Sequence, residues 1–147
     1  MRNNKGFTLM ELLAVIVILG LISTIAIPNI IGLSTGIKKD QMLDDAKKLI
    51  SLAKYKINSN ISLRGSSQTF YISDLNFNGD IGKDPDGGDY NSNSRVEYKI
   101  NDSNKVSYCI VLLGSKRSIG SDTNCIIEEE LYARSNVVDN TPAPEAP

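Results

Sequence analysis

One stretch of the sequence constrains this chain more than any other. From Leu12 to Ile37 there is no ionisable side chain, a run of 26 residues. A helix needs roughly 20 predominantly apolar residues to cross a bilayer, so the run is long enough. It is also apolar on every side, whereas a helix on the surface of a globular protein is apolar on one face. The run therefore predicts a helix that is covered by lipid or by other copies of itself.

The residues before the run predict its orientation. Arg2 and Lys5 are basic, and positively charged flanks stay in the cytoplasm. We therefore expect residues 1–6 inside the cell and the remainder outside. Three interpretations stay open at this point. The run is a secretory signal with a poor small-residue cleavage site at 24–26, a permanent single-span anchor, or a helix that later packs against its own copies.

Glu11 does not fit a plain membrane anchor. A carboxylate at the centre of a membrane span costs about 2.5–3.5 kcal/mol. The cost is smaller near the membrane edge, and the dipole of the first helical turn favours an anion. A partner cation would offset the remaining free-energy cost of the Glu11 carboxylate. If the chain were cut before Phe7, the new α-amine would lie at the depth of Glu11 in a neighbouring copy.

The sequence KGFTLMELLAVIVILGLISTIAIP, from Lys5 to Pro28, resembles the N-terminus of the type IV pilins and pseudopilins. The resemblance rests on a basic leader that ends in Gly6, the order Gly-Phe-Thr-Leu-x-Glu, and Pro28 where the family has its helix-bending proline. It implies that a prepilin peptidase cleaves between Gly6 and Phe7 and methylates the Phe7 amine. It also implies that Glu11 neutralises this amine in an adjacent subunit, while the helices bundle as a filament core.

Composition and resemblance together divide the chain into four parts. The first two are a leader and an apolar segment that we call the stem. The third is a charged part that we call the head, and a Pro-rich, extended tail follows it. The expected ranges are 1–6 for the leader, 7–36 for the stem, 37–140 for the head and 141–147 for the tail.

The head begins with a predicted amphipathic helix over 37–58. Apolar residues recur there at three- to four-residue spacing. Read with the stem, this predicts one long helix from about Thr8 to about Asn58, bent at Pro28. We interpret the charged residues of the second half as a solvated helix face, namely Lys38, Lys39, Asp40, Asp44, Asp45, Lys47, Lys48 and Lys54.

Short strands and turns are predicted over 59–135. Alternating or β-branched runs indicate strands, and the sequence NDSN at 101–104 is typical of a turn between two of them. The fold class is therefore α+β, with the long helix packed on a small antiparallel sheet, which is also the architecture that the resemblance implies. The expected strands are 68–72, 95–100, 105–113 and a short one at 126–127 or 130–133.

A polar loop from Asn76 to Ser94 holds four acidic residues, Asp80, Asp84, Asp86 and Asp89. Oxygen-rich loops can bind Ca²⁺, and some pseudopilins bind calcium in a loop near this point. The spacing does not follow the EF-hand pattern, and Asp, Asn and Gly also form turns. The four residues are calcium candidates on this basis, and no other cofactor is expected.

Cys109 and Cys125 are the two cysteines of the chain. Two cysteines in an exported domain commonly pair, and in many type IV pilins two C-terminal cysteines close a surface region. These two are placed accordingly, so we expect a disulfide. Two free thiols are the alternative.

The composition argues against most catalytic functions. The 147 residues include no His, which excludes His-dependent catalysis and His-ligated zinc. The formal net charge of −1 excludes a strongly basic nucleic-acid-binding protein. We therefore expect a structural protein, not an enzyme.

The resemblance implies a subunit of an extracellular type IV pilus for adhesion or twitching motility. The alternatives are a minor pilin or a pseudopilin of a type II secretion or DNA-uptake apparatus, and, as a different class, a membrane-anchored binding module. Expected partners are copies of the chain, other pilins, the prepilin peptidase and the assembly platform. The precursor is expected in the cytoplasmic membrane and the assembled subunit outside the cell.

Overall fold

The computed structural model describes residues 7–76, 79 and 81–140, with the side chains of 24–32 left out. The leader and the tail therefore lie outside the described residues. The chain divides between Gly36 and Ile37 into two compact units. Each unit is described by itself below.

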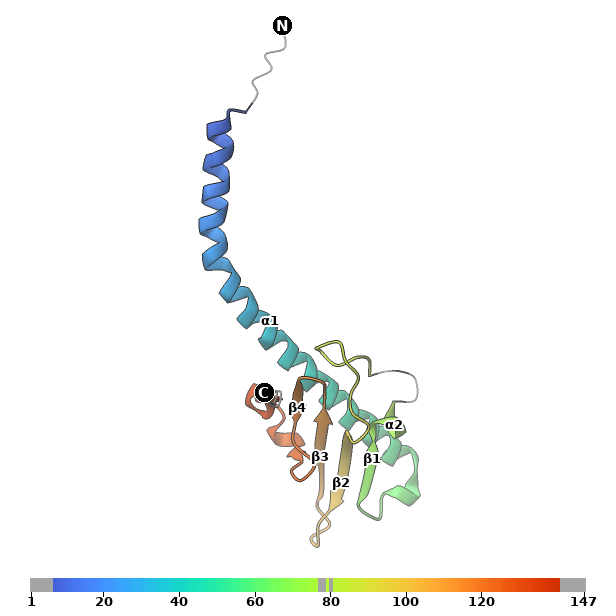
Figure 1. Cartoon of the computed structure of the whole chain (residues 1–147). Coiled ribbons are helices and arrows are strands. Elements are labelled where there is room, and N and C mark those ends of the chain that lie inside the picture. Colours follow the sequence, from blue (N-terminus) through green and yellow to red (C-terminus); the bar gives the residue numbers. More distant parts are fainter. Residues whose placement is uncertain (1–6, 77–78, 80, 141–147) are drawn as a thin grey trace, which may run out of the picture. The chain divides into compact units, whose positions relative to one another are not determined.

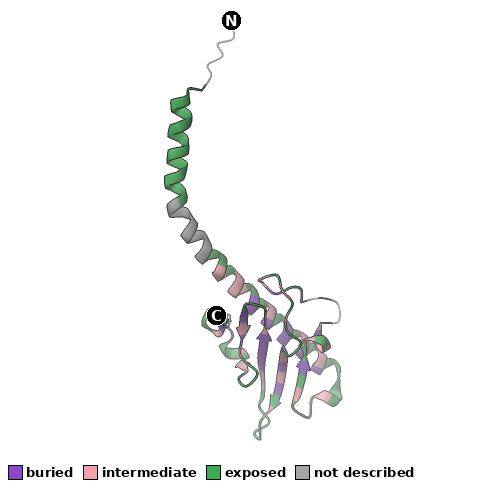
Figure 2. Ribbon diagram, viewed as in Figure 1, coloured by how far each residue is buried: buried purple, intermediate pink, exposed green. Residues whose placement is uncertain are grey.

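One helix, α1, runs through both units (Figure 1). It spans Leu9–Ser59, which confirms the predicted long helix to within one residue at each end. The helical backbone continues through Pro28. In the first unit, every side chain from Phe7 to Ser23 is exposed, shown in green in Figure 2.

The second unit is built on an antiparallel sheet with the strand order β1-β2-β3-β4-β6, and β5 pairs with β3. The hairpin of β2 and β3 is its longest pairing, with Arg95 opposite Val111 and Ile100 opposite Val106. Asn104 adopts a φ of 57° in the turn between them, a left-handed conformation that Asn tolerates. The strands are β1 Gln68–Tyr71, β2 Arg95–Ile100, β3 Val106–Leu113, β4 Arg117–Ile119, β5 Ile126–Ile127 and β6 Val137–Asp139.

The second half of α1 covers one face of this sheet. Strand residues alternate between faces, so Val96 and Tyr98 of β2 lie in the core together with Ile110 and Leu112 of β3. One face of α1 supplies the opposite side of the core, through Met42, Leu43, Ala46, Leu49, Ile50, Ala53 and Ile57. The predicted α+β pilin fold is therefore confirmed.

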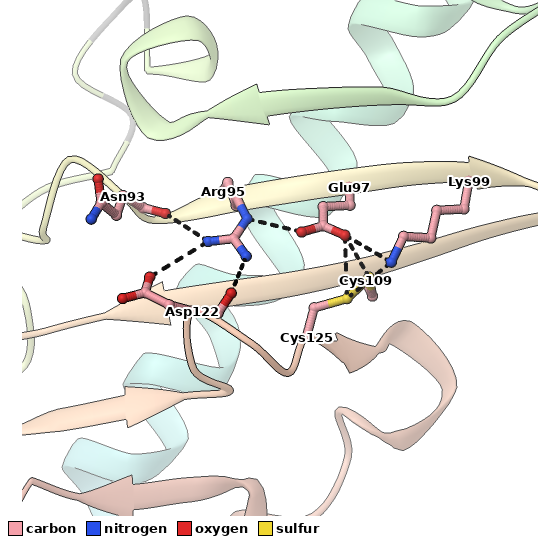
Figure 3. A network of polar contacts seen from close by, with 7 residues as sticks. All are labelled: Asn93, Arg95, Glu97, Lys99, Cys109, Asp122 and Cys125. Atoms are coloured by element: carbon pink, nitrogen blue, oxygen red, sulfur yellow. Dashed lines mark hydrogen bonds and ion pairs between the residues drawn. A yellow bond between two sulfur atoms is a disulfide. The ribbon is translucent and has the colours of Figure 1, made fainter.

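The other face of β2 carries charged side chains. Arg95, Glu97 and Lys99 alternate with the core residues and point away from α1 (Figure 3). Glu97 stands directly opposite Cys109 of β3. The alternation thus separates an apolar face from a polar one within a single strand.

Several predicted boundaries are wrong. The first strand ends at Tyr71 because a short helix, α2, follows over Ile72–Leu75; the Asp74 carboxylate accepts a hydrogen bond from the Tyr71 amide at 3.1 Å. β4 lies in a stretch for which no strand was predicted. β6 lies beyond the predicted limit of 135. The candidate strand at 130–133 is absent, and two short 3₁₀ helices lie in this region, at Glu128–Glu130 and Arg134–Asn136. A third 3₁₀ helix of the second unit spans Ile61–Leu63.

Candidate functional site

The N-terminal end of α1 is closed by a reciprocal pair, Thr8 and Glu11. The Thr8 amide and hydroxyl both donate to Glu11 Oε2, at 2.8 and 3.0 Å. The Glu11 amide in turn lies 3.3 Å from Thr8 Oγ1, to which it donates. This is a capping box, which satisfies otherwise unpaired amides of the first helical turn. The capping box was not predicted, although the spacing Thr-x-x-Glu before an apolar run is its known signal.

The capping box fixes the position of the Glu11 carboxylate at the start of the helix. The side chain is exposed, and no ion pair between described residues involves it. Phe7 precedes Thr8 and is 84% exposed. The carboxylate and the Phe7 backbone therefore lie at the same end of α1.

The stem presents apolar side chains in all directions behind this end. Its large apolar residues from Phe7 to Ile22 are between 50% and 85% exposed. Burying one such side chain stabilises by about 1.5–3 kcal/mol, so the surface is a strong candidate for contact with lipid or protein. Of the helices that the structure describes, however, none meets the length and apolarity of a membrane span.

Two predicted site residues cannot be located. Gly6 lies outside the described residues, and so does the side chain of Pro28. The proposed cleavage between Gly6 and Phe7 and the role of Pro28 therefore stay predictions.

Cys109 and Cys125 form a disulfide, with their Cα atoms 5.5 Å apart. The bond joins β3 to the loop before β5. Gly120 opens that loop with a φ of 70°, and a Cβ there would lie 2.6 Å from the Asn124 carbonyl oxygen, so a larger residue would not fit. The predicted pairing is confirmed.

A polar network on β2 surrounds the disulfide (Figure 3). Arg95 Nε donates to Glu97 Oε1 at 2.9 Å, and Lys99 Nζ lies 2.8 Å from Glu97 Oε2. Lys99 and then Arg95, by their hydrogen bonds, hold the pKa of Glu97 below its ordinary value although burial opposes them. Arg95 also donates to the Asp122 carbonyl oxygen at 3.0 Å. The network thus ties the loop before β5 to the outer face of the sheet.

The acidic loop is organised by donors from the protein itself. Asp84 is buried and accepts bonds from the amides of Asp86 and Gly88 at 2.9 Å each and from that of Ser115 at 2.5 Å. Burial alone would raise the pKa of Asp84, but these bonds hold it below the ordinary value.

Asp86, whose side chain is only 4% exposed, pairs with Lys38 at 3.0 Å and with Arg117. Burial would raise its pKa as well, and the two cations outweigh that effect. Asp89 pairs with Lys83 at 2.8 Å. Asp80 lies outside the described residues, so calcium binding by the full set of four stays a prediction.

Part of the charged helix face forms ion pairs with the head, which the prediction of a solvated face did not include. Lys38 pairs with Asp86, Lys39 with Asp139 at 2.9 Å, and Asp40 with Arg134 at 2.5 Å. Three consecutive residues of α1 thus bind three different segments of the head. Helical neighbours point about 100° apart, so these segments contact α1 from different sides at this level. Asp44 and Lys47 do form an exposed pair on α1 itself, as a solvated face would.

One of the comparisons with known proteins matches the same N-terminal region. The family described as "Prokaryotic N-terminal methylation motif" matches residues 1–27. The type II secretion system core protein G of Dickeya chrysanthemi is 37% identical over 59 residues, 40% of this chain. The match covers only 39% of the length of that relative. No solved structure matches the chain.

The methylation motif covers the residues on which the family resemblance was based, except Pro28, and the similar curated protein is a core protein of a type II secretion system. The described part of that motif contains the exposed apolar residues of the stem and the capping box of Thr8 and Glu11. The predicted resemblance of this chain to the type IV pilins and pseudopilins is therefore confirmed.

Proposed function

We propose that this protein is a structural subunit of a type IV pilus-like filament and not an enzyme. The observation that carries the proposal is the stem surface from Phe7 to Ile22, which one chain leaves uncovered. In lipid, apolar helices gain little from each other. Outside the membrane they are exposed to water, and mutual burial at about 25 cal/mol per Å² drives association.

The capping box gives a physical basis for subunit register. Cleavage before Phe7 creates an α-amine one residue from Thr8, at the end of α1 where Glu11 stands. The Glu11 carboxylate receives bonds from Thr8 but has no cation among the described residues. The amine of an adjacent subunit supplies the missing charge, and this contact sets the stagger between neighbouring stems.

In this proposal the precursor lies in the cytoplasmic membrane with residues 1–6 in the cytoplasm. A prepilin peptidase removes the leader and methylates Phe7. The assembly platform then inserts the subunit, alone or with other pilins, into an extracellular filament for adhesion or twitching motility.

Mass spectrometry of the exported chain tests the processing step. We expect an N-terminus at Phe7 that carries one methyl group. Gly6→Val is a useful variant, because Gly6 is the residue that the peptidase is expected to require before the cut, and its product should keep the leader. A chain that begins at Met1, or near Ile27 after signal-peptide cleavage, would contradict the proposal.

A pseudopilin is the second candidate, favoured by the similarity to a type II secretion core protein. The two functions differ in the filament that is found. Electron microscopy of sheared surface material, with the subunit identified by antibody, should show long fibres for a pilin. A secretion or DNA-uptake defect in the deletion strain, without surface fibres, would favour the pseudopilin. A chain that stays monomeric in the membrane would favour a binding module and contradict both.

A further inference from the structure

The outer face of the sheet holds a group of potential metal ligands that the proposed function does not use. Glu97, Cys109 and Cys125 each place one ligand atom within 4.8 Å of the others. Glu97 Oε2 lies 3.8 Å from Cys109 Sγ and 3.6 Å from Cys125 Sγ. We propose that, once the disulfide is reduced, these three residues bind a thiophilic divalent cation such as Zn²⁺.

The distances already suit such a site. With Zn–S at 2.3 Å and Zn–O at 2.0–2.2 Å, two tetrahedral ligands of sulfur and oxygen stand about 3.5 Å apart. The two sulfur–oxygen distances are close to that value. Two tetrahedral thiolates stand about 3.8 Å apart, so only the sulfur atoms have to separate once their bond is broken. Cys125 lies in a loop, which can make this movement, whereas Cys109 is fixed in β3.

The surroundings hold the carboxylate ready. Arg95 binds Glu97 Oε1 and leaves Oε2 directed toward the sulfur atoms (Figure 3). Partners of this kind, bound to the outer side of a ligand, orient metal ligands in many proteins. Lys99 Nζ lies 2.8 Å from Oε2 and 3.6 Å from Cys125 Sγ, so its ammonium occupies the cation position in the oxidised chain. Lys99 is half exposed and can turn away when a metal enters.

The site is reachable from solvent. A cavity of about 380 Å³ adjoins the disulfide and is lined by Ser107, Thr123 and Ile127 in addition to the charged residues of β2. A metal with three protein ligands keeps one open position, which faces this cavity. Two thiolates select Zn²⁺ over Mg²⁺ or Ca²⁺, because soft sulfur ligands disfavour hard cations.

The chemistry balances with an external dithiol as reductant. One dithiol sulfur attacks a cysteine sulfur and the other closes the cyclic disulfide of the reductant. The dithiol loses two electrons and two protons, which appear as the thiols of Cys109 and Cys125. Metal binding then releases both protons to solvent. The disulfide thus acts as a redox gate on the site.

Cobalt titration tests the proposal on the full chain in detergent micelles. The protein is reduced with a dithiol, freed of it under argon, and titrated with Co²⁺ alone. The chain holds two cysteines and no His, so a sulfur-to-cobalt charge-transfer band reports these cysteines. We expect one equivalent bound to the reduced chain, displacement by Zn²⁺ but not by Ca²⁺, and no band for the oxidised chain.

Matched variants assign the ligands. Loss of a residue that only orients a metal ligand weakens metal binding 10–100-fold. Glu97 is proposed as a ligand itself, so Glu97→Gln is expected to weaken binding by at least about 10-fold. Cys125→Ser should abolish the band, and Glu129→Gln, at an exposed acid outside the cluster, should leave it unchanged. Circular dichroism records whether the reduced chain keeps its sheet. The proposal is wrong if the reduced chain gives no charge-transfer band, whether or not it keeps its sheet. It is also wrong if Glu97→Gln binds Co²⁺ with the same affinity as the unchanged protein.

Discussion

The stem and the head treat their apolar side chains in opposite ways. Large apolar residues of the stem, from Phe7 to Ile22, are at least 50% exposed, whereas those of the core in the head are at most 5% exposed. The head covers its apolar residues with its own sheet and helix. The described side chains of the stem from Phe7 to Ile22 have no such cover, and in the proposed function lipid or neighbouring copies supply it. Mutations in the two regions should therefore affect different measurements.

The largest effect is expected from Glu11→Ala. Because the variant removes the carboxylate that is proposed to pair with the neighbouring amine, filament yield should fall to background, while membrane insertion and cleavage before Phe7 persist. Electron microscopy and mass spectrometry measure the two outcomes. Thr8→Ala is the matched control: it removes the hydroxyl bonds of the same capping box, worth about 1 kcal/mol, but keeps the carboxylate, so filament yield should fall less. Normal filaments from Glu11→Ala would refute the pairing.

A pair of Ile→Ala substitutions tests the contrast in burial directly. Ile110 is fully buried in the core, and Ile16 is 59% exposed in the stem. Truncating a buried Ile costs about 2–5 kcal/mol, so Ile110→Ala should lower the free energy of unfolding of the head by that amount. Ile16→Ala should leave it unchanged and instead weaken assembly. Denaturant unfolding followed by the tyrosine signal of the head is the measurement, and equal losses in both variants would break the comparison.

A smaller effect is expected at the ion pairs that bind the acidic loop to α1. Among the described residues, removing Asp86 leaves the buried Arg117 with one ion-pair partner, Asp139 at 2.9 Å. Breaking a buried pair typically costs 3–5 kcal/mol, and with this remaining partner we expect about 3 kcal/mol for Asp86→Ala. Asp44→Ala, at an exposed pair, is the control and should cost at most about 0.5 kcal/mol. Thermal unfolding of both variants checks the difference, and equal losses would show that burial does not strengthen the Asp86 pairs.

Most of the fold was predictable because it depends on periodicity. The helix of 51 residues and the β2–β3 hairpin follow from apolar spacing and from the turn signal at 101–104. β4 and β6 were not predictable, since strands of three residues carry no readable alternation. They are held by contacts remote in sequence, such as Arg117 to Asp86. For the same reason, the ion pairs of Lys38 and Asp40 were not predicted, because their partners lie 48 and 94 residues away.

The site was predictable to a different degree. Phe7 and Glu11 could be identified because the family resemblance depends on the local order of residues. The capping box of Thr8 and Glu11 was equally local and was missed. The ligand group around the disulfide was beyond reach, because Glu97 meets the cysteines only through the register of β2 and β3.

Acid should weaken the head. The pKa values of Asp84 and Asp86 lie below their ordinary 3.8, so near that pH the unfolded chain binds more protons than the folded one. Their stabilising contribution is complete above the ordinary pKa and is lost as pH falls through the lower folded values. Melting temperatures of the head should therefore decline below about pH 4. In Asp86→Asn the decline should be shallower, and an identical decline would exclude Asp86 as a source.

The smallest effect is expected from adding calcium. This measurement distinguishes an acidic loop held by the protein's own donors from one held by a bound cation. Asp84 receives three backbone amides, and Lys38 and Arg117 neutralise Asp86. A cation that entered would have to displace these donors, so neither Ca²⁺ nor a chelator should shift the melting temperature. A true site would behave differently, since a ligand at 100 times its Kd stabilises by about 2.7 kcal/mol. Arg117→Met sharpens the test, because it removes the built-in cation beside Asp86. If calcium restores the stability that Arg117→Met has lost, the loop carries a cation site that Arg117 normally fills. If calcium also stabilises the unchanged head, the oxygen-rich sequence of the loop indicates a calcium site.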